Sequence, residues 1–157
     1  MKPFVFRRQR MLRLAEGFER DRRNALAAAV VRLSRAEDFL AELHRKCQEL
    51  MEKRSNLLTR GADIVEVQDN YQGEVELDIR IEAQEKVIAR FEEEVAKRRD
   101  ELAERMRERK TYEKLRERAW ERYRVDEGRE EIRVVDDIAT ISLERIRAGE
   151  AGEIYEG

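Results

Sequence analysis

The chain has 157 residues, of which 45% are charged, yet the formal net charge is only −2. One proline and seven glycines leave few residues suited to the tight turns of a sheet, so a β or α/β fold is excluded. The composition, rich in Ala, Glu, Leu, Lys and Arg, is typical of long helices and coiled coils, and we expect an all-α protein.

The first helix is expected over residues 1–58. Its apolar residues recur mostly in alternating steps of three and four, which indicates a heptad seam. The steps from Phe18 through Arg22 to Leu26 are two fours in a row, which predicts a local loosening of the supercoil. The expected seam residues are Leu14, Phe18, Leu26, Ala29, Leu33, Ala36, Leu40, Leu43, Cys47, Leu50 and Leu57.

A connecting loop is expected over residues 59–63, where Gly61 can adopt the left-handed conformation that ends a helix. Asp63 and Glu66 have the spacing of a capping box, so a second helix is expected to begin at residue 64 and to continue to 147. Gly73 should weaken its first turns, and Gly128 is a possible interruption. We expect residues 148–157 to form a disordered tail.

The second helix carries a similar seam. Its expected residues are Val67, Tyr71, Asp78, Ile81, Ile88, Phe91, Val95, Leu102, Met106, Tyr112, Leu115, Ala119 and Tyr123. Because each helix needs a partner for its apolar stripe, the two are expected to form a long antiparallel two-helix coiled-coil hairpin that is monomeric when free. A parallel homodimer or a larger bundle is the alternative that the same heptads support.

Folding the chain near residue 61 places position 61−k beside position 61+k. Residues 1–24 and 97–124 each carry a net charge of +5, and this folding brings the two basic blocks together. The loop half of the hairpin carries about −6, as do residues 125–157. Such a charge distribution orients encounters with an acidic partner.

The residue pattern offers little for catalysis, and we expect no enzyme, no metal and no cofactor. His44 and Cys47 could supply two metal ligands, but a structural zinc site needs four. Cys47 lies in the expected seam and is better explained as a small core residue. The longest apolar run, residues 25–31, is too short to span a membrane, so neither membrane insertion nor a signal peptide is expected.

Aromatic residues alternate with basic ones near Trp120, a pattern that nucleic-acid surfaces also show. Tyr112 and Tyr123 occupy expected seam positions, and the near-neutral net charge argues against a nucleic-acid partner. An exposed tryptophan among arginines is more often an anchor for another protein. We therefore interpret Trp120 as part of a protein interface.

Several strings follow one another in a recognisable order: MKPFVF at residues 1–6, MLRL at 11–14, RSNL at 54–57, NYQ at 70–72, RERKTYEKLRER at 107–118 and VDDIA at 135–139. Together they resemble the FliJ family, the small coiled-coil component of the bacterial flagellar type III export apparatus. The resemblance covers residues 1 to about 140.

This resemblance implies a cytoplasmic protein, peripheral to the inner membrane at the flagellar base, that inserts its basic open end into the hexameric export ATPase. It also implies contacts with the export gate, a membrane protein, and with export chaperones. The ATPase-binding residues would be Arg7, Arg8, Arg10, Arg13, Arg109, Lys110, Lys114, Arg116, Arg118, Trp120, Arg122, Asp136 and Ile138, with Ala139 in the same C-terminal string. The gate-binding residues would be Lys46, Glu49, Lys53, Tyr71, Glu74 and Asp78, although this surface is more charged than docking surfaces usually are.

Three other functions remain open from the sequence. The chain could be the equivalent stalk subunit of a virulence-type secretion system, which gene neighbours would distinguish. It could be a structural spacer that dimerises through its seam and has no ATPase partner. A nucleic-acid-binding coiled coil is the last alternative, and it would require salt-sensitive retention of DNA or RNA.

Overall fold

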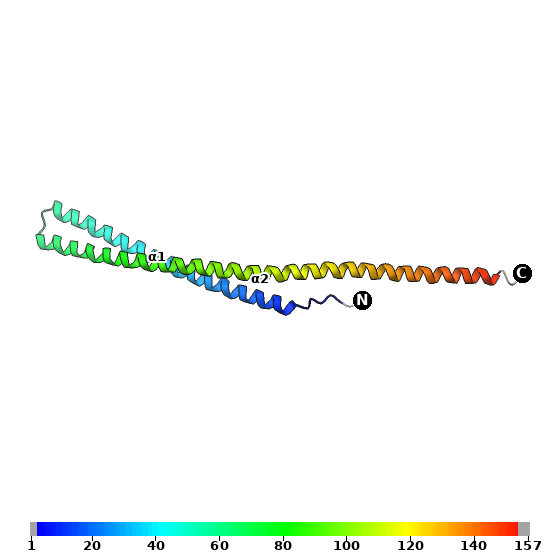
Figure 1. Cartoon of the computed structure of the whole chain (residues 1–157). Coiled ribbons are helices and arrows are strands. Elements are labelled where there is room, and N and C mark those ends of the chain that lie inside the picture. Colours follow the sequence, from blue (N-terminus) through cyan, green and yellow to red (C-terminus); the bar gives the residue numbers. More distant parts are fainter. Residues whose placement is uncertain (1–2, 154–157) are drawn as a thin grey trace. The chain divides into compact units, whose positions relative to one another are not determined.

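The computed structural model describes residues 3–153, and side-chain exposure as far as residue 149. Two helices make up most of this range: α1, Gln9–Thr59, and α2, Ile64–Glu153 (Figure 1). No strand occurs between residues 3 and 153. The expected all-α fold of two long helices packed against each other is confirmed.

The connection between the helices is closed by backbone hydrogen bonds around Gly61. Gly61 has a φ of 70°, the left-handed conformation that the sequence predicted for it. Its N–H donates to the Leu58 carbonyl at 3.3 Å, and the N–H of Ala62 donates to the Leu57 carbonyl at 3.0 Å. These two bonds satisfy carbonyls that the end of α1 leaves open, so the chain can reverse direction within a few residues. The carboxylate of Glu66, expected in a capping box, accepts from Arg60 at 3.2 Å.

The seam of α1 is a more regular heptad than the sequence suggested. Leu14 and Phe18 are 54% and 47% exposed, so their predicted seam positions are wrong. Leu12, Ala15 and Glu19 are buried instead, and the steps of three and four continue through Arg22 to Leu26 without a break. The two successive steps of four, on which the predicted loosening of the supercoil was based, are therefore absent from the seam. Phe18 lies at the edge of the seam, where the Arg105 guanidinium covers its ring at 5.1 Å from the centroid.

Near the loop, the seam of α2 is polar. Tyr71 and Asp78 are exposed, whereas Asn70 and Glu74 are buried, so the first two were wrongly predicted as seam residues. The helices approach closely here, because a Cβ built on Gly73 would lie 3.2 Å from Cδ1 of Leu50. The Gly73 position thus favours close helix packing, which offsets its low helix propensity.

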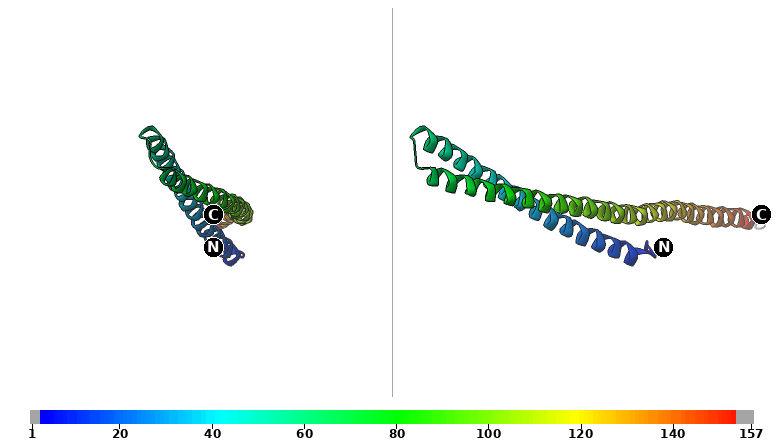
Figure 2. Two further views of the ribbon diagram at one scale, coloured as in Figure 1. Left: turned by 90° about the vertical axis from the view of Figure 1, so that its left-hand side faces the viewer. Right: turned by 60° about the vertical axis from the view of Figure 1, so that its left-hand side comes forward.

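The chain forms two compact units, residues 15–108 and residues 1–14 with 109–157. Within residues 15–108, α1 and α2 run antiparallel and wind around each other (Figures 1 and 2). Contacts between the helices follow the predicted pairing about residue 61, which is confirmed: Arg22–Glu101 at 3.1 Å, Arg32–Glu94 at 2.8 Å, Gln84 Nε2 to the Ala36 carbonyl at 2.9 Å, and Cys47 Sγ to Asp78 at 3.7 Å.

The ends of the helices differ from the expected boundaries. Helix α1 begins only at Gln9, because residues 3–8 form an irregular segment whose Phe6 carbonyl accepts the Gln9 N–H at 3.1 Å. Helix α2 continues through Gly128 and through residues 148–153, where an interruption and a disordered tail were expected. No turn requires Gly128, and its cost of about 1 kcal/mol relative to alanine does not break so long a helix. Residues 1–2 and 154–157, which belong to the expected first helix and tail, lie outside the described range.

Neither helix, within the described residues, contains a segment long and apolar enough to cross a membrane.

Candidate functional site

The basic candidate residues all lie in one unit, residues 1–14 with 109–157. On α2, Lys110, Lys114, Arg118 and Arg122 follow one another in steps of four, so they form a slowly turning row along the helix. All four side chains are exposed. We call the exposed candidate cations, which are part of the exposed cations of this unit, the basic surface: Arg7, Arg8, Arg10, Arg13, Lys110, Lys114, Arg116, Arg118 and Arg122.

The structure brings the N-terminal part of the basic surface onto α2. Arg7 and Arg8 line one open groove together with Arg122. Most other residues that line the groove are apolar, Leu115 and Ala119 among them, and Asp126 adds one carboxylate. Residues from the two basic blocks, 1–24 and 97–124, therefore form one surface, as the predicted reversal of the chain near residue 61 implied. Arg10, Arg13, Lys110, Lys114 and Arg118 are exposed outside this groove.

Arg109 differs from the other candidate cations. Its guanidinium is ion-paired with Glu113 one turn away, and its side chain is only 23% exposed. A partner would have to break this pair to use Arg109, so its contribution to the basic surface is smaller than the sequence suggested.

An aromatic cluster adjoins the basic surface. The Phe4 ring meets Trp120 edge to face with centroids 5.1 Å apart, and Trp120 stacks on Tyr123 at 5.6 Å. Trp120 remains 45% exposed and lines a second groove, of about 500 Å³, with Phe4, Glu113, Arg116 and Glu117. The sequence did not identify Phe4 as part of this site. The pairing about residue 61 was the available signal, because it places residue 4 beside residue 118.

Tyr123 is held by its surroundings in the neutral form. Partial burial raises the pKa of its phenol, and the nearby Glu127 carboxylate raises this pKa further. The hydroxyl donates to Oε1 of Glu127 at 3.4 Å. The aromatic cluster therefore carries no charge of its own at neutral pH.

Asp136 and Ile138 lie farther along α2, in a stretch where every residue from 129 to 149 is exposed. Ile138 is 60% exposed. Both residues belong to the same unit as the basic surface. Both side chains are therefore available to a partner, and neither lines the two grooves described above.

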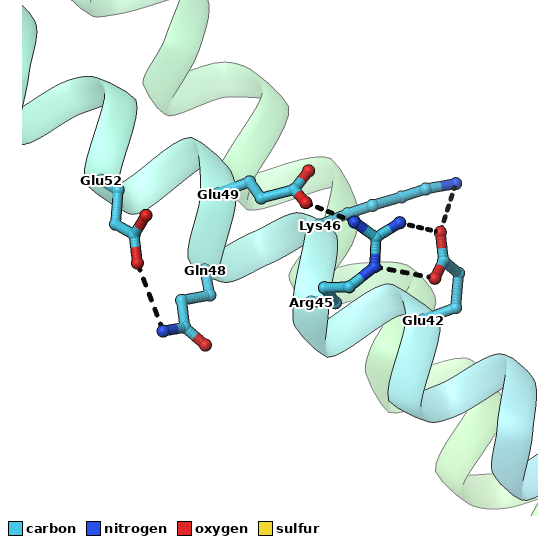
Figure 3. Close-up of polar contacts among 6 residues, drawn as sticks. All are labelled: Glu42, Arg45, Lys46, Gln48, Glu49 and Glu52. Atoms are coloured by element: carbon cyan, nitrogen blue, oxygen red, sulfur yellow. Dashed lines mark hydrogen bonds and ion pairs between the residues drawn. The ribbon is translucent and has the colours of Figure 1, made fainter.

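The gate candidates lie in the other unit, and Figure 3 shows two of them, Lys46 and Glu49, with their polar partners on α1. Arg45 is central: its guanidinium bonds both carboxylate oxygens of Glu42, at 2.6 and 3.0 Å, and also bonds Glu49. Nζ of Lys46 is 3.7 Å from the same Glu42. The Arg45 guanidinium, through its hydrogen bond, lowers the pKa of Glu42. Gln48 donates to Glu52 at 3.3 Å on the same helix.

The remaining gate candidates have different surroundings. Lys53 is exposed and lines an open groove near the loop with Arg60 and Asp69. Tyr71 is 54% exposed, and the Arg54 guanidinium lies 5.8 Å from its ring centroid. Asp78 is also exposed and accepts from the Cys47 thiol. Glu74 is only 4% exposed, so it belongs to the seam and cannot contact a partner surface directly.

Residues that could support metal or thiol chemistry are not gathered into a site within the described part of the chain. No group of three or more His, Cys, Asp or Glu side chains between residues 3 and 149 could hold a metal ion. Cys47 is buried, and both burial and the Asp78 carboxylate raise the pKa of its thiol. A reactive cysteine needs the opposite, a lowered pKa with access to solvent.

Comparison with known proteins identifies one family. A family model described as "Flagellar FliJ protein" matches residues 6–147, which is most of the chain. No curated protein matches it. No solved structure matches it either.

Proposed function

The chain belongs to the FliJ family of the flagellar type III export apparatus, and from this premise we propose that it is a non-enzymatic stalk for the hexameric export ATPase. The basic surface enters the centre of the ATPase ring and promotes its assembly and activity. The observation that carries this proposal is the meeting of Arg7 and Arg8 with Arg122 in one groove.

The electrostatics of this unit support a protein ring as the partner. Clustered cations on a slender helical element create a directed field, which steers encounters with acidic surfaces and fixes their orientation. The aromatic cluster adds a partly exposed Trp120 next to Arg116. Tryptophan and arginine are the residues most often found at the energetic centre of protein interfaces. Asp136 and Ile138 extend the proposed contact along α2.

We extend the proposal to the other partners that the family resemblance implies. The export gate would contact the exposed residues near the loop: Lys46, Glu49, Lys53, Tyr71 and Asp78. Export chaperones would bind the same hairpin, which would lie in the cytoplasm at the inner membrane below the flagellum. Tyr71 is the best single test of the gate contact, because it is the one aromatic side chain among these residues.

The ATPase proposal is tested by titrating the protein into a purified flagellar export ATPase while ATP hydrolysis is measured. We expect stimulation that saturates near one chain per six ATPase subunits. Replacing Lys114, Arg116 and Arg118 together by Glu should weaken binding at least tenfold, because each reversal turns an attraction into a repulsion. Circular dichroism of the variant should remain helical.

A matched control reverses three other exposed cations, Arg35, Arg80 and Arg90, which lie in residues 15–108. This control changes the net charge by the same amount, and it should stimulate the ATPase as the parent does. Equal loss in both triple variants would show that only the net charge matters and would refute a site on the basic surface. Unchanged binding by the first variant would refute it as well.

A further inference from the structure

The C-terminal part of α2 exposes a broad apolar face. No residue from 129 to 149 is buried, and in Figure 1 this end of α2, orange to red, runs past the blue N-terminal segment of the same unit. At 3.6 residues per turn, its apolar residues cover about half of the helix circumference. They are each 51–64% exposed: Ile132, Val134, Val135, Ile138, Ile141, Leu143 and Ile146. An apolar face of this extent indicates an interaction surface.

The charged residues of this stretch lie mostly on the opposite side of the helix and are matched in sign. Each charged residue on that opposite side has an opposite charge three or four residues away, the spacing at which side chains on one helix interact. Arg129, for example, pairs with Asp126 at 3.8 Å. The residues matched in this way are Arg129, Glu130, Arg133, Asp136, Asp137, Glu144 and Arg147.

Glu131 and Arg145 are the exceptions between residues 129 and 147. Neither has an opposite charge three or four residues away, since Glu131 is flanked at those distances by Glu127, Gly128, Val134 and Val135. Arg145 is flanked there by Ile141, Ser142, Ala148 and Gly149. The two residues are about four helical turns apart, so both project from the same side of α2, the apolar side. An acid and a base on an apolar face favour a partner that supplies the complementary charges.

We propose that a second copy of this chain covers this face, with the two α2 segments antiparallel and a two-fold axis at Ile138. Ile138 is the midpoint between Glu131 and Arg145. In this arrangement Glu131 of one copy lies opposite Arg145 of the other, and the symmetry repeats the pair. The apolar residues between them face each other around Ile138. Each copy thus offers the other an apolar face, and the charge at each end of this face lies opposite a charge of the other sign.

The same charges disfavour a parallel pairing of two copies. A parallel pair would place Glu131 against Glu131 and Arg145 against Arg145, and like charges across an interface are destabilising. The interface spans about three heptads, the shortest length at which a coiled coil is expected. Self-association should therefore be weak and dependent on concentration.

The sequence led us to expect a monomer, because each helix can bury its apolar seam against the other within the hairpin. The exposed face around Ile138 is not part of that seam. A dimer would cover Ile138, which we also propose as an ATPase contact. Self-association and ATPase binding would then compete for this part of α2.

The test measures the molar mass of the full chain by sedimentation and light scattering, from micromolar to millimolar concentrations, without any ATPase. We expect a reversible monomer–dimer equilibrium. Glu131→Arg and Arg145→Glu should each weaken the dimer about tenfold, because each places two like-charge pairs across the interface. The double variant, Glu131→Arg with Arg145→Glu, restores both opposite-charge pairs and should return the dimer to the parent affinity.

Ile138→Glu should abolish dimerisation, since it places two carboxylates at the two-fold axis. Its matched control is Ile79→Glu, because Ile79 is 63% exposed on the same helix but lies in the other unit. This control should dimerise as the parent does. A chain that stays monomeric at every concentration overturns the proposal, and loss of ATPase binding in Ile138→Glu would then assign the face to the ATPase. If the single variants weaken the dimer and the double variant does not restore it, the antiparallel pairing is overturned.

Discussion

Arg54 on α1 and Glu74 on α2 form an ion pair across the hairpin, with Nη1 and Oε2 2.9 Å apart. The Glu74 side chain is only 5% exposed, and Nδ2 of Asn70 donates to its other oxygen at 3.1 Å. The same amide nitrogen donates to the Leu50 carbonyl at 2.8 Å. Polar groups in a coiled-coil seam can fix the register of the helices at some cost in stability. These three residues therefore tie one turn of α2 to one turn of α1.

Removing the cation should destabilise the hairpin more than a surface substitution does. Arg54→Met leaves the buried Glu74 carboxylate without its charged partner, and we expect a loss of about 2 kcal/mol in the free energy of unfolding. The loss is smaller than for a fully buried pair, because the Arg54 side chain is 34% exposed. Urea unfolding followed by circular dichroism measures it. The double variant Arg54→Met with Glu74→Leu should recover most of the loss, and an unaltered Arg54→Met protein would contradict this role.

The two helical glycines of α2 should respond differently to alanine. A Cβ on Gly128 meets nothing within 4 Å, so Gly128→Ala should stabilise the helix by about 1 kcal/mol. At Gly73 the new Cβ would lie 3.2 Å from the Leu50 side chain, which must shift to accommodate it. Gly73→Ala should therefore gain less than Gly128→Ala, or lose stability. Thermal unfolding of both variants provides the comparison, and an equal gain at both positions would show that the helices do not approach closely at Gly73.

The buried thiol should make stability fall at alkaline pH. Folding raises the pKa of Cys47 through burial and the Asp78 carboxylate, so the folded state favours the protonated thiol. This contribution is fully present below the ordinary thiol pKa of about 8.5, and it is lost as the pH rises through the higher pKa of the folded state. Urea unfolding at several pH values, for the parent and for Cys47→Ala, isolates it. The parent should lose more stability than the variant above about pH 9, and parallel pH profiles would contradict the assignment.

The contact between the N-terminal segment and α2 can be followed through Trp120, the single tryptophan of the chain. The Phe4 ring covers part of the indole, so Phe4→Ala should shift the tryptophan emission to longer wavelength and increase quenching by iodide. Val5→Ala is the control, because Val5 is 76% exposed. It should leave the emission unchanged. Identical spectra for all three proteins would mean that residues 3–8 do not rest on α2 in solution.

Helical periodicity and turn chemistry were enough to predict the fold class, the turn at Gly61 and the pairing of distant segments. These follow from local causes: the heptad period identifies the helices, and glycine alone adopts a left-handed φ without strain. A reversal at a known residue then determines which segments lie together, so the meeting of the basic N-terminal residues with Arg122 could be predicted without any structure.

The choice of side chains that enter the seam near the loop and at the start of α1 depends on how the two helices pack. Tyr71 and Asn70 are adjacent in sequence, and a shift of one residue exchanges one helix face for another. Hydrophobicity favours Tyr71 as the seam residue. Asn70 and Glu74 are buried there instead, because the helices approach closely at Gly73 and the Arg54 guanidinium pairs with the Glu74 carboxylate. The packing of Phe4 on Trp120 is likewise invisible to helical periodicity, because residues 3–8 are not helical. Such choices depend on the surface of the segment packed opposite, and the apolar pattern of one helix carries no information about that surface.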